Sequence, residues 1–154
     1  MYEVVPIGVI RSPFKDKKDA PIQGAFEPDA RGFIEIDEEY VAGLLDIDQF
    51  SHLIVLYWMD RARTVDLRPI PFLDDAPHGI FATRNPRRPN KIGLMVVALE
   101  RVEGNVLYIG NVDALDGTPV IDVKPYVPRF DSVPHADEGW FAGRENRPKP
   151  EGRE

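Results

Sequence analysis

The chain has 154 residues, 43% of them hydrophobic, no cysteine, and a formal net charge of −7 at pH 7. This length fits one domain with one sizeable core, and the apolar content argues against global disorder. The absence of cysteine excludes disulfides, thiolate metal sites and a cysteine nucleophile, and the acidic balance argues against non-specific coating of nucleic acid. No apolar run reaches the length of a membrane-spanning helix, and the N-terminus does not resemble a signal peptide. We therefore expect a cytoplasmic protein that is not inserted in a membrane.

The first half of the chain predicts three strands. Residues 3–10 and 31–37 are rich in β-branched and aromatic side chains, and 50–59 is the most apolar run in the sequence. Pro6 interrupts the first run, which indicates an edge strand or a bulge. We expect the third run to be a central strand.

A short helix is predicted at residues 37–45. Asp37 can cap its first turn, where acidic residues favour the positive end of a helix. The side chains expected to pack it on the sheet are Leu44, Leu45 and Ile47.

The second half predicts further strands after a long connection at residues 60–77. Loops of that length inside a compact domain are usually functional or disordered, and the arginines here favour function. The expected strands are 79–84, 92–100, 105–112 and 120–123. Many short strands with few helices predict a mainly β fold, a single-domain β-barrel with one or two short helices over residues 3–130. Residues 131–154 are expected to be a partly docked extension with a frayed end.

A basic loop interrupts the apolar stretch 79–99. It contains four cations, and no acidic residue occurs between positions 76 and 99. Pro86 and Pro89 stiffen its backbone by fixing φ. The cations are Arg84, Arg87, Arg88 and Lys91. Because a simple strand turn is shorter and rarely rich in arginine, the loop predicts an anion or nucleic-acid contact, and a solvated charged loop is the alternative.

A polar strand face follows near the end of the predicted barrel. Asp122, Lys124 and Tyr126 alternate, so their side chains share one face of a strand. Buried charge is costly without partners, which favours a pocket lining over a core. His52 precedes an apolar strand and can equally be a structural residue. The histidines lack the spacing of metal ligands, so we expect no metal site.

Four segments together resemble the TsaA-like family of TrmO-type proteins. They occur in the family's order and span roughly residues 3–130. The segments are residues 7–14 (IGVIRSPF), 50–53 (FSHL), 79–94 (GIFATRNPRRPNKIGL) and 115–126 (LDGTPVIDVKPY).

The resemblance implies a β-barrel methyltransferase that uses S-adenosyl-L-methionine and acts as a homodimer. Its implied reaction is N6-methylation of threonylcarbamoyl-adenosine beside the anticodon of tRNA. Asp122, Lys124 and Tyr126 match the family segment that marks the reacting end of the pocket, as candidate catalytic residues. The implied cofactor contacts are Pro21, Gln23, His52, Leu53, Arg84, Leu94, Leu115, Asp116, Gly117, Thr118 and Pro119.

Within this resemblance the basic loop divides into two parts. Arg84 and Leu94 are expected to face the cofactor, and Arg87, Arg88 and Lys91 the phosphates of the tRNA anticodon loop.

Two features depart from the bacterial relatives. Ile22 stands where they carry arginine, so any contact of that side chain is missing. The chain is also expected to lack their additional C-terminal domain. Two alternative functions follow: a non-catalytic β-barrel RNA-binding or adaptor module, and a methyltransferase with another acceptor.

Overall fold

The computed structural model describes residues 1–15 and 30–144, which form two compact units. The first unit combines Met1–Asp60 with Ile92–Tyr126. The second combines Arg61–Lys91 with the chain from Val127 onward. The predicted domain of residues 3–130 therefore includes a stretch, Arg61–Lys91, that belongs to the second unit.

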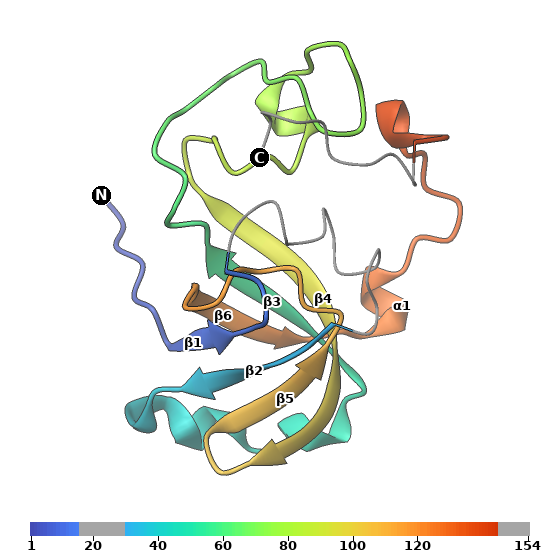
Figure 1. The fold of residues 1–154 in the computed structure, drawn as a ribbon. Coiled ribbons are helices and arrows are strands. Elements are labelled where there is room, and N and C mark those ends of the chain that lie inside the picture. Colours follow the sequence, from blue (N-terminus) through green and yellow to red (C-terminus); the bar gives the residue numbers. More distant parts are fainter. Residues whose placement is uncertain (16–29, 145–154) are drawn as a thin grey trace. The chain divides into compact units, whose positions relative to one another are not determined.

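Within the described ranges, the first unit is a closed barrel of six antiparallel strands (Figure 1). Their order around the barrel is β1-β2-β5-β4-β3-β6, and pairing of β1 with β6 closes it. The strands are β1 (Gly8–Arg11), β2 (Arg31–Ile36), β3 (His52–Trp58), β4 (Ile92–Glu103), β5 (Val106–Gly110) and β6 (Pro119–Pro125). The mainly β barrel predicted from the sequence is thus confirmed.

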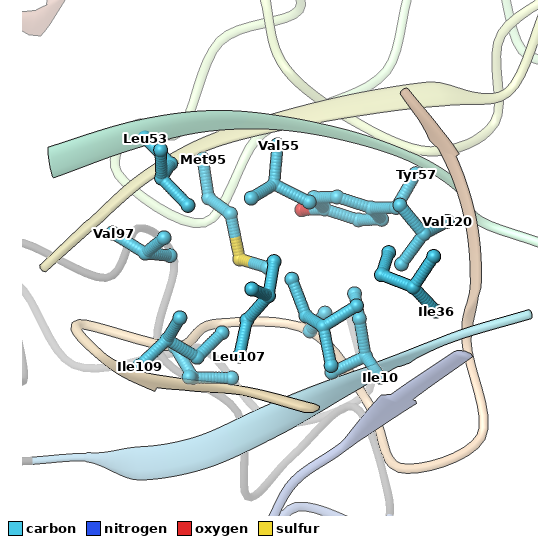
Figure 2. Close-up of a cluster of buried hydrophobic side chains, with 13 residues drawn as sticks. Ile10, Ile36, Leu53, Val55, Tyr57, Met95, Val97, Leu107, Ile109 and Val120 are labelled. Atoms are coloured by element: carbon cyan, nitrogen blue, oxygen red, sulfur yellow. The ribbon is translucent and has the colours of Figure 1, made fainter. Parts of the chain in front are cut away.

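Alternate side chains of the strands fill the barrel with one apolar core (Figure 2). In β3, Leu53, Val55 and Tyr57 are buried, whereas the residues between them are partly exposed. Burying a large apolar side chain is worth about 1.5–3 kcal/mol, so this cluster is the main source of barrel stability. The cluster contains Ile10, Ile34, Ile36, Leu53, Val55, Tyr57, Met95, Val97, Leu107, Ile109, Val112, Ala114 and Val120.

Tyr57 needs the space left by Gly93, its partner on β4. A Cβ atom on Gly93 would overlap the tyrosine ring. The Tyr57 hydroxyl donates a hydrogen bond to Asp113 Oδ1 at 3.0 Å, and both side chains are buried. Tyr57 therefore ties β3 to the segment that follows β5.

The helix predicted at residues 37–45 is present as a 3-10 helix, η2 (Glu38–Leu44), followed by η3 (Ile47–Gln49). Leu44 and Ile47 pack against the core as expected. The expectation for Leu45 is wrong, because its side chain is 83% exposed. Leu44 is the last residue of η2 and Ile47 the first of η3, whereas Leu45 lies in the turn between the two helices. Asp37 precedes η2 but makes no side-chain capping hydrogen bond.

The strand limits differ from the prediction at both ends of the barrel. β1 begins only at Gly8, so Pro6 lies outside the strand. Proline has no N–H to donate to a neighbouring strand, whereas Ile7 N does donate to Val120 O at 2.8 Å. β4 continues to Glu103, beyond the predicted end at residue 100.

The second unit contains only short helices among its described residues: η4 (Ile80–Ala82), α1 (Pro128–Asp131) and η5 (Gly139–Phe141). The predicted strand at 79–84 is therefore wrong. Thr83 donates from both its backbone N–H and its hydroxyl to Ile80 O, which closes a tight turn. Hydroxyl side chains offer the backbone this local alternative to pairing in a sheet.

Candidate functional site

The turn at residues 115–119 is fastened to the start of the barrel. Gly117 N donates to Ile10 O at 2.7 Å, and Asp116 N donates to Phe14 O at 2.7 Å. The hydroxyl of Ser12 donates to Ala114 O at 2.7 Å. Gly117 has a φ of +83°, a conformation that favours glycine. The predicted cofactor turn is thus a rigid feature of the barrel.

Two side chains of this turn are engaged inside it. The hydroxyl of Thr118 donates to Leu115 O at 2.7 Å. Asp116 accepts hydrogen bonds from Ser12 N at 3.1 Å and from Lys15 Nζ at 2.7 Å. The Lys15 hydrogen bond holds the pKa of Asp116 below its ordinary value of 3.8, and the Ser12 bond acts in the same direction. The Asp116 carboxylate is therefore ionised at neutral pH and paired with the ammonium group of Lys15.

His52 and Tyr126 lie next to each other at the end of β3 that is farther from the 115–119 turn. Their rings lie edge to face with centroids 6.3 Å apart, and Tyr126 N donates to His52 O at 3.1 Å. Ser51 Oγ lies 2.8 Å from His52 Nδ1.

Asp122 and Lys124 form an ion pair on the outer side of β6, with Nζ and Oδ2 2.9 Å apart. Asp122 pairs with Leu56 and Lys124 with Ile54, which are the outward-facing positions of β3. These two residues therefore share one strand face, as predicted. The hydrogen bond to Asp122 raises the pKa of Lys124 above its ordinary value of 10.5, so the ammonium stays charged at neutral pH. Both side chains are exposed, at 42% for Asp122 and 60% for Lys124.

Leu53 and Leu94 differ in what they can offer a ligand. Leu53 is fully buried in the barrel core, so only its backbone is available for contact. Leu94 points outward from β4 in a row of three exposed apolar side chains, with Ile92 and Val96. Their partners on β3 are Trp58, Leu56 and Ile54, so an apolar strip covers the outside of both strands.

The barrel does not bring all of its predicted cofactor residues together. His52 and Tyr57 are five positions apart on β3, about 16 Å along the strand. Tyr57 pairs with Val120, next to the 115–119 turn, whereas His52 lies at the other end with Tyr126. Leu94 is close to the turn's end of the strand, because its partner Leu56 also pairs with Asp122.

In the second unit, Arg88 holds the basic loop together. Its Nη1 atom lies 2.9–3.4 Å from the carbonyl oxygens of three residues, and these are Ile80, Thr83 and Asn85. Its guanidinium thus satisfies backbone acceptors that form the η4 turn. A residue predicted to contact RNA has a clear structural role as well.

The other cations of the loop have partners too. Arg87 Nε donates to Thr64 Oγ1 at 2.9 Å, and Arg87 Nη1 lies 3.7 Å from Asp66. Lys91 Nζ donates to Arg88 O at 3.1 Å. Arg84 is exposed. The loop is therefore braced from within, while its charge remains on the surface.

Aromatic residues from the predicted C-terminal extension complete the second unit. Trp140 stacks between His78 and Phe141, with centroid distances of 4.4 and 4.0 Å. His78 Nε2 donates to Asp74 Oδ2 at 2.7 Å, which holds the pKa of Asp74 below 3.8. Sequence reasoning missed this cluster. The only signal was two large aromatic residues in an otherwise polar segment.

Some predicted features lie beyond what the structure describes. Pro21, Ile22 and Gln23 fall outside the described residues. Within 1–15 and 30–144, no group of three or more His, Asp or Glu residues is arranged to hold a metal ion. In the same ranges no helix is long and apolar enough to cross a membrane.

The family model described as the tRNA-methyltransferase O N-terminal domain matches residues 9–132. That range contains the barrel strands, the basic loop and the 115–119 turn. The chain belongs to the TrmO family. The resemblance read from the four sequence segments is therefore confirmed.

Two relatives and one solved structure place the chain within this family. A probable S-adenosyl-L-methionine-binding protein of Pyrococcus abyssi is 49% identical over 136 residues, covering 88% of this chain and 74% of the relative. A mouse tRNA (adenine(37)-N6)-methyltransferase is 36% identical over 134 residues, covering 82% of this chain and 31% of the mouse protein. The crystal structure of TrmO from Pseudomonas aeruginosa matches with a TM-score of 0.76 at 39% identity, covering 90% of this chain.

This chain spans a different share of each relative. It spans 61% of the solved Pseudomonas TrmO chain and 31% of the mouse protein.

Proposed function

We propose that this chain is an S-adenosyl-L-methionine-dependent methyltransferase acting on N6 of threonylcarbamoyl-adenosine next to the anticodon of tRNA, in the cytoplasm. The observation that carries the proposal is the family match over residues 9–132, which includes every described residue assigned to the cofactor, the reaction or the RNA. The names of the Pyrococcus and mouse relatives support the cofactor and the acceptor class respectively.

The chemistry of the barrel residues fits this cofactor. S-adenosyl-L-methionine, when bound, supplies a methyl group activated by a positively charged sulfonium. Asp116 offers a carboxylate whose lowered pKa keeps it ionised, which suits a cationic ligand. Leu94 offers an exposed apolar side chain for an adenine ring. Leu115–Pro119 would hold the cofactor as a fixed turn, since its backbone is already fastened to β1.

Methyl transfer demands positioning above all. A bound S-adenosyl-L-methionine would supply the methyl group, and the protein would have to accept the proton that the acceptor nitrogen loses. A protein accelerates such an in-line displacement chiefly by aligning donor and amine. Asp122, Lys124 and Tyr126 are the proposed residues at the reacting end. Tyr126 and Asp122 are candidate proton acceptors, and Lys124 keeps Asp122 in place through their ion pair.

The acceptor base is proposed to come from the anticodon loop of tRNA. Bases in such loops are already partly unstacked, which lowers the cost of placing one in a pocket. Arg87, Arg88 and Lys91 would contact phosphates, where charge positions the RNA without reading its sequence. Their internal hydrogen bonds support a loop that is ordered before RNA arrives.

A homodimer is part of the proposal. The apolar strip on β3 and β4 exposes Ile92, Leu94 and Val96 by 37–42% each. Two copies packed through this strip would cover it. They could also bring His52 of one copy toward the 115–119 turn of the other, whereas one cofactor would have to extend along the barrel to reach both groups in a single copy. In sedimentation experiments, Val96→Glu should convert a dimer to a monomer, and Leu45→Glu, at an exposed leucine outside the strip, should not.

The experiment that tests the function uses purified protein with radiolabelled S-adenosyl-L-methionine. We expect methyl transfer to tRNA that carries threonylcarbamoyl-adenosine and none to the same transcript without it. Mass spectrometry of the digested nucleosides should place the methyl group on N6 of that base. Without cofactor binding in calorimetry, the RNA-binding or adaptor function would replace the enzyme. Cofactor binding without transfer to this base would point to another acceptor.

A further inference from the structure

A groove of about 380 Å³ lies within the second unit, outside the barrel residues assigned to the cofactor turn. Two segments far apart in the sequence form its walls. One is Phe81–Arg84 at the end of η4, and the other is Asp137–Phe141 around η5. All of its lining residues belong to one compact unit.

One wall of the groove is a rigid aromatic platform. The Trp140 ring lies nearly parallel to the rings of His78 and Phe141, at interplanar angles of 12° and 25°. Its indole N–H donates to Ala82 O at 2.7 Å, which joins the two walls. His78 is held in turn by Asp74. Little ordering is left for a ligand to impose, so a flat group can bind without a large entropic cost.

Phe81 supplies a second aromatic surface. Its side chain is 78% exposed, whereas the neighbouring Ile80 is fully buried and anchors the turn. An exposed phenylalanine is common on protein surfaces, but one that lines a groove beside a fixed aromatic stack indicates a surface for a flat apolar partner.

The charges of the lining distinguish a base from a phosphate. Arg84, a predicted cofactor contact, lines the groove together with two acidic residues, Asp137 and Glu138. Two carboxylates would repel a phosphate, but they can accept hydrogen bonds from exocyclic amino groups of a nucleobase. The basic loop begins at Arg84 and carries three further cations, Arg87, Arg88 and Lys91.

We propose that this groove binds a nucleobase of single-stranded RNA, stacked on Phe81 beside the Trp140 platform. Every base has a flat face, so the contact would add affinity without strict sequence preference. The inference rests on the proposed function for the identity of the RNA, an anticodon loop. It assigns the base contact to Phe81 and the phosphate contacts to the neighbouring cations.

The first experiment measures binding of an unmodified anticodon stem-loop RNA by fluorescence anisotropy. Base–aromatic stacking predicts that Phe81→Ala weakens binding about 5- to 150-fold, and that Phe81→Tyr restores most of it. The slope of affinity against salt should not change, because no charge is removed. The matched control is Phe130→Ala, since Phe130 is a 70% exposed phenylalanine of the same unit outside the groove. Equal losses in the two alanine variants would overturn the proposal.

The second experiment separates RNA from the adenine of the cofactor. Calorimetry with S-adenosyl-L-methionine should give the same affinity for Phe81→Ala as for the unmodified protein. A loss of cofactor affinity with unchanged RNA binding would assign the groove to the cofactor and overturn the proposal. Failure of the unmodified protein to bind cofactor would refute the proposed function alone, because the RNA measurement does not require it.

A third experiment observes the groove directly through tryptophan fluorescence. The chain has two tryptophans, so Trp58→Phe leaves Trp140 as the reporter. Binding of the stem-loop should quench this fluorescence, and the quenching should disappear when Phe81→Ala is added at RNA concentrations that saturate only the parent. Quenching that persists unchanged in the double variant would overturn the assignment to Phe81.

Discussion

Each of the two compact units is stabilised internally by a different kind of interaction. The barrel combines strand pairing with a core of thirteen buried residues. The second unit has only short helices in its described part and depends on side chains that bond to its backbone, as Arg88 and Trp140 do. A core of this kind tolerates surface change well, whereas a loop braced by single side chains depends on each one. The cations of the basic loop therefore cannot be assigned to ligand binding from their charge alone.

The largest effect should come from opening the barrel core. Leu107 is fully buried, so Leu107→Ala should lower the free energy of unfolding by about 2–5 kcal/mol. Urea denaturation followed by circular dichroism measures this loss. Leu45→Ala, at a leucine that is 83% exposed, is the matched control and should change stability by less than about 0.5 kcal/mol. Similar losses in the two variants would contradict the barrel as the main source of stability.

In the second unit, Arg88→Ala should open the loop locally. The carbonyl oxygens of Thr83 and Asn85 lose the Arg88 donor, whereas Ile80 O keeps its two hydrogen bonds from Thr83. Leaving such acceptors unpaired costs about 1–3 kcal/mol. Faster amide hydrogen exchange at Thr83 and Asn85, with unchanged exchange in the barrel strands, is the expected result. Arg63→Ala, at an exposed arginine of the same unit, serves as control. If exchange in the loop stays as slow as in the control, Arg88 is not a brace.

Arg84 and Lys91 should separate cofactor binding from RNA binding. Arg84→Ala is expected to weaken S-adenosyl-L-methionine binding about tenfold, the size of one charged hydrogen bond. Lys91→Ala should weaken RNA binding, lower its salt dependence by about one counterion, and leave cofactor affinity within about twofold. Calorimetry and anisotropy at several salt concentrations measure the two affinities. Equal losses of cofactor affinity in both variants would refute the division.

The smallest effect concerns the ion pair of the 115–119 turn. Because the folded-state pKa of Asp116 lies below 3.8, its carboxylate stabilises the barrel above that pH, and this contribution disappears as pH falls through the folded pKa. The unmodified protein should exceed Asp116→Asn by about 1 kcal/mol or less near pH 6, and the difference should vanish in acid. Thermal unfolding as a function of pH measures it, with Asp48→Asn as an exposed control. A difference that grows toward low pH would reverse the assigned sign.

Much of the barrel could be predicted from the sequence because strand patterns are local. Runs of apolar and β-branched residues predicted β2, β3 and all but the last three residues of β4. The alternation of Asp122 and Lys124 predicted that the two side chains share one strand face. The segment at 79–84 was misassigned, since four apolar residues do not reveal whether a neighbouring strand exists. There the hydroxyl of Thr83 closes a turn instead.

The arrangement of the candidate site could not be predicted, because it depends on contacts between residues far apart in the sequence. His52 and the 115–119 turn lie at opposite ends of β3. This separation follows from the strand register, which cannot be predicted from one sequence. The partners of Trp140 lie about sixty positions away in the chain, at His78 and Ala82. The sequence predicted only a partly docked C-terminal extension, and the structure identified the residues that Trp140 contacts.

The basic loop also has a consequence for how such proteins can change over evolution. The chain leaves the barrel after Asp60 and returns at Ile92, and Ile92 pairs directly with Trp58 on the neighbouring strand. The barrel thus fixes the two ends of this insertion close together. Doubling the length of a flexible loop costs only about 0.6 kcal/mol in closure entropy. The insertion can therefore be lengthened, shortened or replaced at little cost to the barrel.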